Sequence, residues 1–416
     1  MTQQRRGKAA SRAAIAVAAS VALTMTGCAK SDDTGNTDRA AAAIAAVPAA
    51  FAGKAATGSP VKIGLLNPEG SAAANFPESR VAAEAVVAYA NEHLGGLAGH
   101  KIELVRCDLV AEDPSTMTAC ANQMVQDQVA AVVATTGGNG ELMAPIITKA
   151  GIAYTNFQGT SATEFNTPNA FLWNGGVAAT TVNMAKFAAK AGVKNVTMYV
   201  TAVGDIPAHI GAATPILKAM GIDSKIVPIP PGAPDVTGQV QAGLKDKPGA
   251  ITVLGDVSTC IATLKGLKLL NANVDRYLTQ KCAEPAVYEA VPDALEGAYL
   301  FTTAEGTSDH DEAKIYRAVM AKFAPADANL GGNATAGYQT MLAITRMVNA
   351  GIGTNEPTAP NIIAALKAAK AVPLPVGHGI TLTCDGKALP KLPNVCSVGG
   401  FVGEIKQGTA NKFNVL

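Results

Sequence analysis

The stretch Val61-Lys62-Ile63-Gly64-Leu65-Leu66, which runs directly into Asn67-Pro68-Glu69-Gly70-Ser71, decides the fold class of this chain. The first half is a short apolar run and predicts a buried strand, and the second half is rich in turn-forming residues. Apolar residues then recur at helical spacing from Glu78 to Leu94, and Gly95-Gly96 follows, as expected where a helix ends in the left-handed conformation. A strand, a turn and a helix in succession form the repeating unit of an α/β protein.

This unit recurs in two series of similar order and spacing, and the second series begins near Asn195. Strands that alternate with helices predict parallel sheets with helices on their faces. We therefore expect an α/β fold of two similar doubly wound parallel-sheet lobes, joined by a multi-strand hinge because the residues from Tyr299 onward exceed the needs of one lobe. The expected strands are 61–66, 101–105, 130–135 and 151–156 in the first series and 196–200, 225–229, 250–254 and 276–278 in the second.

The length of 416 residues suits two domains rather than one. The expected parts are a signal peptide (1–27), a lipidated flexible tether (28–59), a first lobe (60–175 plus about 303–392) and a second lobe (176–302 plus about 393–416).

The first 28 residues predict export and lipid attachment. Basic residues precede an apolar run of thirteen residues, 13–25, which is too short to span a membrane and is typical of a signal-peptide core. The run ends in Met25-Thr26-Gly27-Cys28, which is similar to the bacterial lipobox and predicts lipidation of Cys28. An ordinary secretory signal with an incidental cysteine is the alternative. The polar residues 31–38 show no apolar period and are expected to form part of the flexible tether.

Composition argues against two classes of protein. Apolar residues make up 48% of the chain and charged residues 16%, so neither a wholly disordered chain nor a basic nucleic-acid-binding surface is expected. The formal net charge is +1, but four of the 33 basic residues and none of the 32 acidic residues lie in residues 1–27. Removal of the signal peptide therefore leaves a net charge of −3.

Six cysteines remain besides Cys28, and in an oxidising compartment an even set predicts disulfides. Six cysteines allow fifteen pairings, and spacing favours the one that closes three short loops. A metal site is the alternative, but it needs closer C-x-x-C spacing or interleaved histidines. The favoured pairs are Cys107 with Cys120, Cys260 with Cys282, and Cys384 with Cys396.

The sequence carries no recognisable catalytic motif. It contains no G-x-S-x-G, H-E-x-x-H or G-x-x-x-x-G-K-[ST] pattern, and its five histidines lie far apart. Asp309-His310-Asp311-Glu312 lacks the glycine and distal glutamate of a calcium loop and is interpreted as a solvated helix start. We expect no enzymatic activity, no metal and no cofactor.

Polar loops at strand ends indicate a binding site. In doubly wound sheets, ligands bind beyond the carboxyl ends of the strands. Gly137-Gly138-Asn139-Gly140 lies at such an end and opens a helix, so its backbone N–H groups suit a small carboxylate. If the two lobes face each other, one cleft is lined by the loops 67–76, 135–140, 157–163, 201–206, 255–259 and 279–283.

The chain from about Val61 onward resembles the branched-chain amino-acid (Leu/Ile/Val) type of periplasmic binding protein, the type I solute receptors of ABC importers. The order and spacing of several segments over some 300 residues carry the resemblance. These segments are 91–99, 112–114, 132–138, 159–164, 295–299 and 337–338.

The resemblance implies ligand-binding roles for residues of the first lobe. In this family, the loop after the third strand and the following Gly-Ala-Thr-type loop hold the α-carboxylate and ammonium groups of the ligand. By position, these roles fall to Gly138 and Asn139 and to Thr160 and Ser161. Phe76 lies where the family often places an aromatic residue against the ligand.

The second lobe departs from the pattern of the family. Asp205 and Asp256 stand near positions where amino-acid binders carry aromatic residues, and Lys281 aligns approximately with the acidic partner of the ligand ammonium. A lysine cannot pair with an ammonium, so an unmodified aliphatic amino acid is disfavoured unless Asp205 or Asp256 takes that role. A solvated charge beside Cys282 is the alternative interpretation of Lys281.

Together these features predict a monomeric extracytoplasmic solute-binding lipoprotein, held on the membrane through its N-terminal lipid. It is expected to capture a small polar or carboxylate-bearing ligand by lobe closure and to deliver it to the permease and ATPase subunits of an ABC importer. No nucleic-acid partner is expected. The alternatives are a ligand-sensing module of a signalling system and, less favoured because no nucleophile and base are evident, a surface hydrolase.

Overall fold

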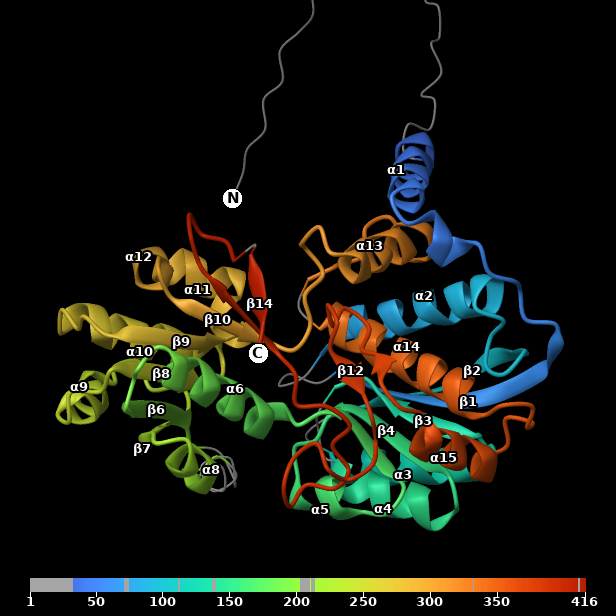
Figure 1. The fold of residues 1–416 in the computed structure, drawn as a ribbon, viewed down its shortest axis with the longest axis horizontal. Coiled ribbons are helices and arrows are strands. Elements are labelled where there is room, and N and C mark those ends of the chain that lie inside the picture. Colours follow the sequence, from blue (N-terminus) through green and yellow to red (C-terminus); the bar gives the residue numbers. More distant parts are fainter. Residues whose placement is uncertain are drawn as a thin grey trace, which may run out of the picture.

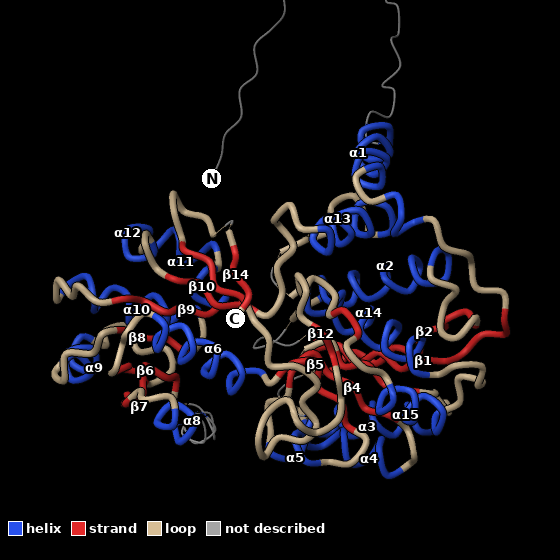
Figure 2. Tube along the Cα trace, in the orientation of Figure 1, coloured by secondary structure: helices blue, strands red, loops and turns tan. Residues whose placement is uncertain are grey.

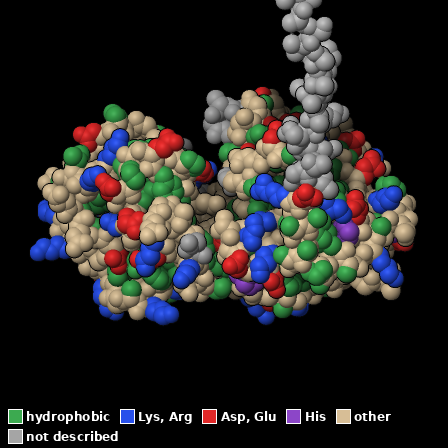
Figure 3. All heavy atoms as spheres, turned by 90° about the horizontal axis from the view of Figure 1, so that it is seen from above, with side chains coloured by type: hydrophobic (Ala, Val, Ile, Leu, Met, Phe, Trp, Pro, Cys, Tyr) green, Lys and Arg blue, Asp and Glu red, His purple; other side chains and the backbone are tan. Residues whose placement is uncertain are grey.

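The computed structural model shows two α/β lobes side by side (Figure 1). It describes residues 33–70, 75–110, 113–136, 140–202, 210, 214–331, 333–410 and 412–416. The expected signal peptide, with Cys28, lies outside the described residues. Seen from above, acidic and basic side chains are interspersed rather than gathered into one basic patch (Figure 3).

The first lobe is built on a five-stranded parallel sheet of order β2-β1-β3-β4-β5. Helices α2 (Pro77–His93), α13 (Asp311–Phe323), α14 (Ala334–Gly351) and α15 (Ala359–Ala368) belong to one apolar core. Helices α3 (Pro114–Gln126) and α4 (Gly140–Lys149) form the core on the other face, and the short α5 spans Ala162–Asn166. The strands are β1 (Gly58–Pro68), β2 (His100–Leu109), β3 (Ala131–Ala134), β4 (Ala153–Gln158) and β5 (Ala170–Asn174).

The alternation of side chains along β1 explains why both faces of this sheet are covered. Ile63 and Leu65 point to the core that contains α2 and α14, whereas Leu66 points to the core that contains α3. Gly64 also faces α3, because a Cβ at this position would lie 2.4 Å from the sulfur of Met124. The strand that decides the fold class is thus buried from both sides, as parallel sheets require.

The second lobe is built on a seven-stranded sheet of order β14-β13-β10-β9-β8-β6-β7, in which only the β10–β13 and β13–β14 pairs are antiparallel. Helices α6 (Gly176–Lys190) and α8 (Thr214–Ala219) lie on one face. The other face is covered by α9 (Thr237–Leu244), α10 (Val257–Leu269), α11 (Pro285–Ala290) and α12 (Pro292–Leu295). The strands are β6 (Asn195–Thr201), β7 (Asp223–Ile229), β8 (Ala250–Leu254), β9 (Asp275–Thr279), β10 (Tyr299–Thr302), β13 (Phe401–Glu404) and β14 (Phe413–Val415).

Three segments pass between the lobes (Figure 2). The first connects β5 to α6 and leads into Gly176, the first residue of α6, whose φ of +56° favours glycine. The second leaves β10 at Thr302, and the third enters β13 at Phe401. The third crossing occurs later than the expected boundary near residue 393, because Leu172 of β5 still donates to Asn394 O at 2.9 Å and accepts from Cys396 N at 2.8 Å.

The expectation of a flexible tether over residues 28–59 needs correction for its described part, residues 33–59. Residues Asp33–Ala45 form helix α1, and Pro48–Phe51 form the 3₁₀ helix η1. Residues 50–56 are bound along α2, because the Tyr89 hydroxyl donates to Ala50 O at 2.7 Å and Ala56 N donates to Asn91 O at 2.8 Å. These hydrogen bonds fix residues 47–58, which we call the arm, to the first lobe.

The sequence did not predict β5 and α6. The run Ala170–Asn174 is only five residues long, and its burial depends on partners distant in the chain. Leu172 packs with Val395, and Trp173 packs in the core that contains α14. When the residues that bury a strand lie more than 150 positions later in the chain, the local sequence gives little indication of that strand.

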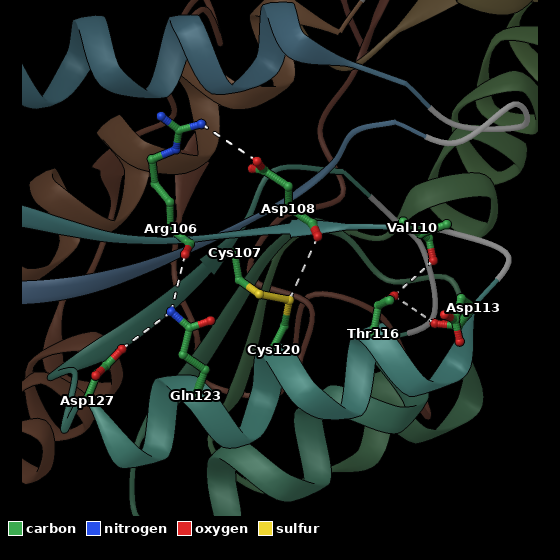
Figure 4. Close-up of a disulfide and its surroundings, with 9 residues drawn as sticks. All are labelled: Arg106, Cys107, Asp108, Val110, Asp113, Thr116, Cys120, Gln123 and Asp127. Atoms are coloured by element: carbon green, nitrogen blue, oxygen red, sulfur yellow. Dashed lines mark hydrogen bonds and ion pairs between the residues drawn. A yellow bond between two sulfur atoms is a disulfide. The ribbon is translucent and has the colours of Figure 1, made fainter.

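The six cysteines form the three pairs that their spacing favours. Cys107 on the edge strand β2 is joined to Cys120 on α3, and the side chain of Gln123 on the same helix donates to Arg106 O at 3.4 Å (Figure 4). Cys260 of α10 is joined to Cys282 of the 3₁₀ helix η2 (Gln280–Ala283), and Cys384 is joined to Cys396. Two pairs therefore connect an α-helix with a strand or a 3₁₀ helix of the same lobe.

A buried histidine lies where the second and third crossing segments meet. His378 Nε2 is 3.1 Å from Glu305 O and 3.3 Å from Glu305 Oε2, and its ring stacks on that of His310 at 4.2 Å and touches Phe401. Burial lowers the pKa of His378, and the neighbouring His310 adds to the shift, although the Glu305 carbonyl opposes it. The folded protein therefore favours the neutral imidazole.

We expect the free energy of unfolding to decrease as the pH falls below about 6.5, because the unfolded chain then binds a proton at His378 that the folded chain resists. His378→Asn should flatten this decrease between pH 7 and pH 5, since asparagine tolerates the φ of +45° but does not titrate. At pH 7.5 the variant should lose about 1 kcal/mol for the weakened hydrogen bond to Glu305. Urea unfolding across this pH range tests the prediction, and equal slopes for the two proteins would contradict it.

Candidate ligand-binding site

A contact between Phe76 and Lys281 joins the strand-end loops of the two lobes. Phe76 directly precedes α2 in the first lobe, and Lys281 lies in η2 directly after β9 of the second lobe. The Lys281 ammonium is 5.8 Å from the centre of the Phe76 ring, within the range of a cation–π contact. The structure thus brings together two of the residues expected to bind ligand.

The position of Lys281 is fixed by its neighbour Cys282. That cysteine is fully buried and is bonded to Cys260, which is also fully buried. The Lys281 side chain is 47% exposed and its ammonium lies 3.5 Å from Glu284 Oε1. The backbone of Lys281 is therefore anchored beside a buried disulfide. Its ammonium is half-exposed at the edge of the second lobe and can contact a ligand there.

Asp256 has a structural role of its own. It is the N-cap of α10, where its carboxylate accepts from Thr259 N at 2.7 Å and from the Ser258 hydroxyl at 2.8 Å. Burial alone would raise the pKa of Asp256, but these hydrogen bonds outweigh it and hold the pKa below its ordinary value. The carboxylate remains charged, yet it is engaged by its own helix.

Asn67 organises the strand ends of the first lobe. Its buried amide donates to Phe76 O at 3.0 Å and to Glu69 Oε1 at 2.9 Å, and its carbonyl accepts from the Thr135 hydroxyl. The end of β1 is thereby tied to the end of β3 and to the residue before α2. Sequence reasoning placed Asn67 in a turn but did not single it out. An asparagine at the end of a buried strand was the available signal.

Thr160 and Ser161 both bind the carboxylate of Glu164. Thr160 donates through its backbone N–H and its hydroxyl, each at 3.0 Å, and the Ser161 hydroxyl lies 3.3 Å from the same oxygen. Ser161 also accepts from Glu164 N as the N-cap of α5. Sequence reasoning quoted Glu164 within a motif but did not include it among the site residues. The Ser161-x-x-Glu164 spacing of a capping box was the signal that could have found it.

Three of the expected ligand-binding residues, Gly138, Asn139 and Asp205, lie outside the described residues. Next to this gap, Thr136 is 8% exposed, and its hydroxyl has no hydrogen-bond partner among the described residues. A buried hydroxyl without a partner is costly, so Thr136 is a candidate to bind a ligand atom.

The described residues give no indication of a metal centre, because no group of three or more His, Cys, Asp or Glu side chains within them is arranged to hold an ion. Among the described helices, none is long and apolar enough to cross a membrane.

Comparison with known proteins reveals one family. A family model described as a periplasmic binding protein matches residues 60–393. No curated protein sequence matches the chain.

Solved structures of similar proteins share the fold at low sequence identity. The branched-chain amino acid transporter substrate-binding protein LivJ from Streptococcus pneumoniae, in complex with isoleucine, is 17% identical with a TM-score of 0.67, over 86% of this chain and 99% of that chain. The leucine-binding protein LivK from Thermotoga maritima is 16% identical with a TM-score of 0.65, over 86% and 98%. A solute-binding protein of an ABC transporter from Rhodopseudomonas palustris, in complex with p-hydroxybenzoic acid, is 19% identical with a TM-score of 0.66, over 86% and 97%.

The disulfide between Cys260 and Cys282 should restrict the motion of residues 279–284, which include Lys281. Replacing Cys260 and Cys282 together by alanine should lower the free energy of unfolding by about 3 kcal/mol in the chain-entropy model and should speed backbone hydrogen exchange at residues 279–284. Replacing Cys107 and Cys120 should cost a similar amount but leave that exchange unchanged. Chemical unfolding and hydrogen–deuterium exchange measure both effects. Unchanged exchange in the first variant would show that the disulfide does not hold the loop.

Proposed function

Because this chain belongs to the periplasmic binding protein family, we propose that it is the extracytoplasmic solute-binding component of an ABC importer and captures a small carboxylate-bearing ligand between its lobes. The observation that carries this proposal is the Lys281 ammonium, which reaches from the second lobe to Phe76 of the first. An anionic group bound at this point would interact with both lobes at once.

The contacts of Lys281 favour exchange for a ligand anion. A cation–π contact at an exposed site contributes about 0.5–1 kcal/mol, whereas a charge-assisted hydrogen bond from an ammonium to a carboxylate contributes about 1.5–3 kcal/mol. The Glu284 carboxylate, 3.5 Å away, is a long and partly exposed partner. A carboxylate held between the lobes would therefore draw the ammonium from its present contacts, while the Phe76 ring remained as an apolar wall.

Closure of the lobes is the proposed mechanism of capture. Only three segments connect the lobes among the described residues, and a ligand that contacts both lobes binds the closed form more tightly than the open one. No covalent step is involved. Isoleucine and p-hydroxybenzoic acid, the molecules bound to two of the similar structures, each carry one carboxylate, which supports the proposed ligand class.

We also propose that lipidation at Cys28 holds the protein at the outer face of the cell membrane as a monomer, from which it delivers its ligand to the permease and ATPase subunits. The arm between residues 47 and 58 supports this arrangement, because it is packed on the first lobe and connects that lobe to helix α1 on its N-terminal side. Palmitate labelling of wild type and Cys28→Ala tests the attachment, and labelling of both or neither would contradict it.

A ligand screen tests the proposed function directly. Thermal-shift measurements with amino acids, keto acids and aromatic acids should identify at least one carboxylate that raises the unfolding temperature. Small-angle scattering with that ligand should show a smaller radius of gyration, since the lobes close on it. The absence of any binder, or binding without compaction, would contradict the proposal.

Lys281→Glu should weaken binding of the identified carboxylate at least tenfold, because it replaces an attraction by a repulsion of similar size. Lys268→Glu is the matched control: it makes the same charge change on α10, where Lys268 pairs with Asp293 at the surface. Isothermal calorimetry should detect the loss in the first variant only. Equal affinities for both variants would exclude Lys281 as the anion partner.

A further inference from the structure

Glu164 is a carboxylate buried without a cationic partner. Its residue exposure is 0%, and among the described residues no lysine, arginine or histidine forms an ion pair with it. Removing a carboxylate from water costs several kcal/mol unless other groups replace the solvent. A protein that keeps such a group must provide hydrogen-bond donors.

Five donors surround the Glu164 carboxylate. Tyr154 Oη at 3.1 Å and Asn156 Nδ2 at 2.8 Å donate to Oε1, and the Thr160 N–H, the Thr160 hydroxyl and the Ser161 hydroxyl donate to Oε2. Burial, together with the Glu164 charge, raises the pKa of Tyr154 well above its ordinary value, so this hydroxyl keeps its proton. Both carboxylate oxygens are therefore used as acceptors.

The backbone also contributes to the stabilisation of this charge. Gly140 is the first residue of the ten-residue helix α4, and a Cβ on it would lie 2.0 Å from Glu164 Oε1. Only glycine allows the carboxylate to approach the positive end of the helix so closely. The negative charge is thus held by hydrogen bonds and dipoles and is not cancelled by a cation.

This charge lies beneath a loop that follows β4, at the carboxyl end of the sheet, where ligands bind in such folds. Thr160 is exposed at the carboxyl end of β4, and both of its donors point inward to Glu164. The hydroxyl therefore has only acceptor lone pairs to offer outward. Across the interlobe contact, Lys281 presents the opposite charge. The first lobe is thereby suited to a ligand cation or donor, and the second lobe to an anion.

We propose that Glu164 is a specificity-determining residue, which makes the first lobe select ligands that carry a positively charged group in addition to a carboxylate. The inference rests on the proposed function and specifies the ligand class of that site. Glu164 acts through Thr160 and the field of its charge rather than by touching the ligand, so it is a positioning residue. In this arrangement an ammonium avoids Lys281 by facing the opposite lobe.

Glu164→Gln is the variant that tests the charge. The hydroxyls of Tyr154, Thr160 and Ser161 can rotate to accept from the new amide. Asn156 can turn its own amide, because its Oδ1 is buried without a partner among the described residues. The variant is therefore expected to fold. Glu141→Gln, at an exposed position on α4, is the control with the same change of charge.

The readout is the ratio of affinities within pairs of probes that differ only in an amino group. Isoleucine with 3-methylpentanoate and phenylalanine with 3-phenylpropanoate are such pairs. Wild type should favour the amino acid of a pair, and Glu164→Gln should reduce this preference about tenfold, while Glu141→Gln leaves it unchanged. Calorimetry at pH 7 gives the affinities, and circular dichroism confirms folding.

The outcomes separate this inference from the proposed function. An equal loss of affinity for both members of a pair would mean that Glu164 only supports the loop, and a preference of wild type for the deaminated acid would also overturn the inference. If none of the four probes binds to wild type, the charge selectivity proposed here is wrong for these ligands. The broader screen of carboxylates then decides independently whether the protein binds a solute at all.

Discussion

The structure depends on the requirement that a parallel sheet be covered on both faces. In the first lobe, Ile63 and Leu65 of β1 are buried on one side and Leu66 on the other, so the body of the strand has no surface left for chemistry. The polar residues Asn67, Thr135 and Thr160 lie at the ends of these strands or just after them. The two sheets have the same constraint, and the contact of Lys281 with Phe76 shows that their loops meet. The binding site is therefore a consequence of the sheet architecture before any particular ligand is considered.

The sequence was sufficient for most of the fold because its strands are short apolar runs bounded by turn residues. The predicted range 250–254, for example, coincides with the observed strand β8. Strand β5 was missed because its neighbours Asn394 and Cys396 follow more than 200 residues later, which no local pattern reveals. The arm was misjudged for the same reason: its alanine-rich residues look flexible until Tyr89 and Asn91 of α2 bind Ala50 and Ala56.

The candidate site was less accessible to sequence reasoning than the fold. Resemblance placed Thr160 and Ser161 at a ligand, and the engagement of both hydroxyls by Glu164 was not inferred, although the capping-box spacing of Ser161 and Glu164 pointed to it. The burial of Glu164 depends on Gly140, which begins a different helix, and on Tyr154 and Asn156 of β4. Residue types alone suggested donors at this loop. The geometry turns those donors inward to Glu164, so they are not free to bind a ligand.

Opposite charges on the two lobes raise the question of why the lobes would not close without a ligand. Bringing Lys281 toward the first lobe would remove part of its hydration, and Glu164 cannot move forward to compensate, because five donors hold it in place. An ion pair between Lys281 and Glu164 would therefore require some of these hydrogen bonds to break. In the proposed mechanism, a ligand with both charges would give each lobe a partner of opposite charge, so that closure would be favoured when the ligand is bound.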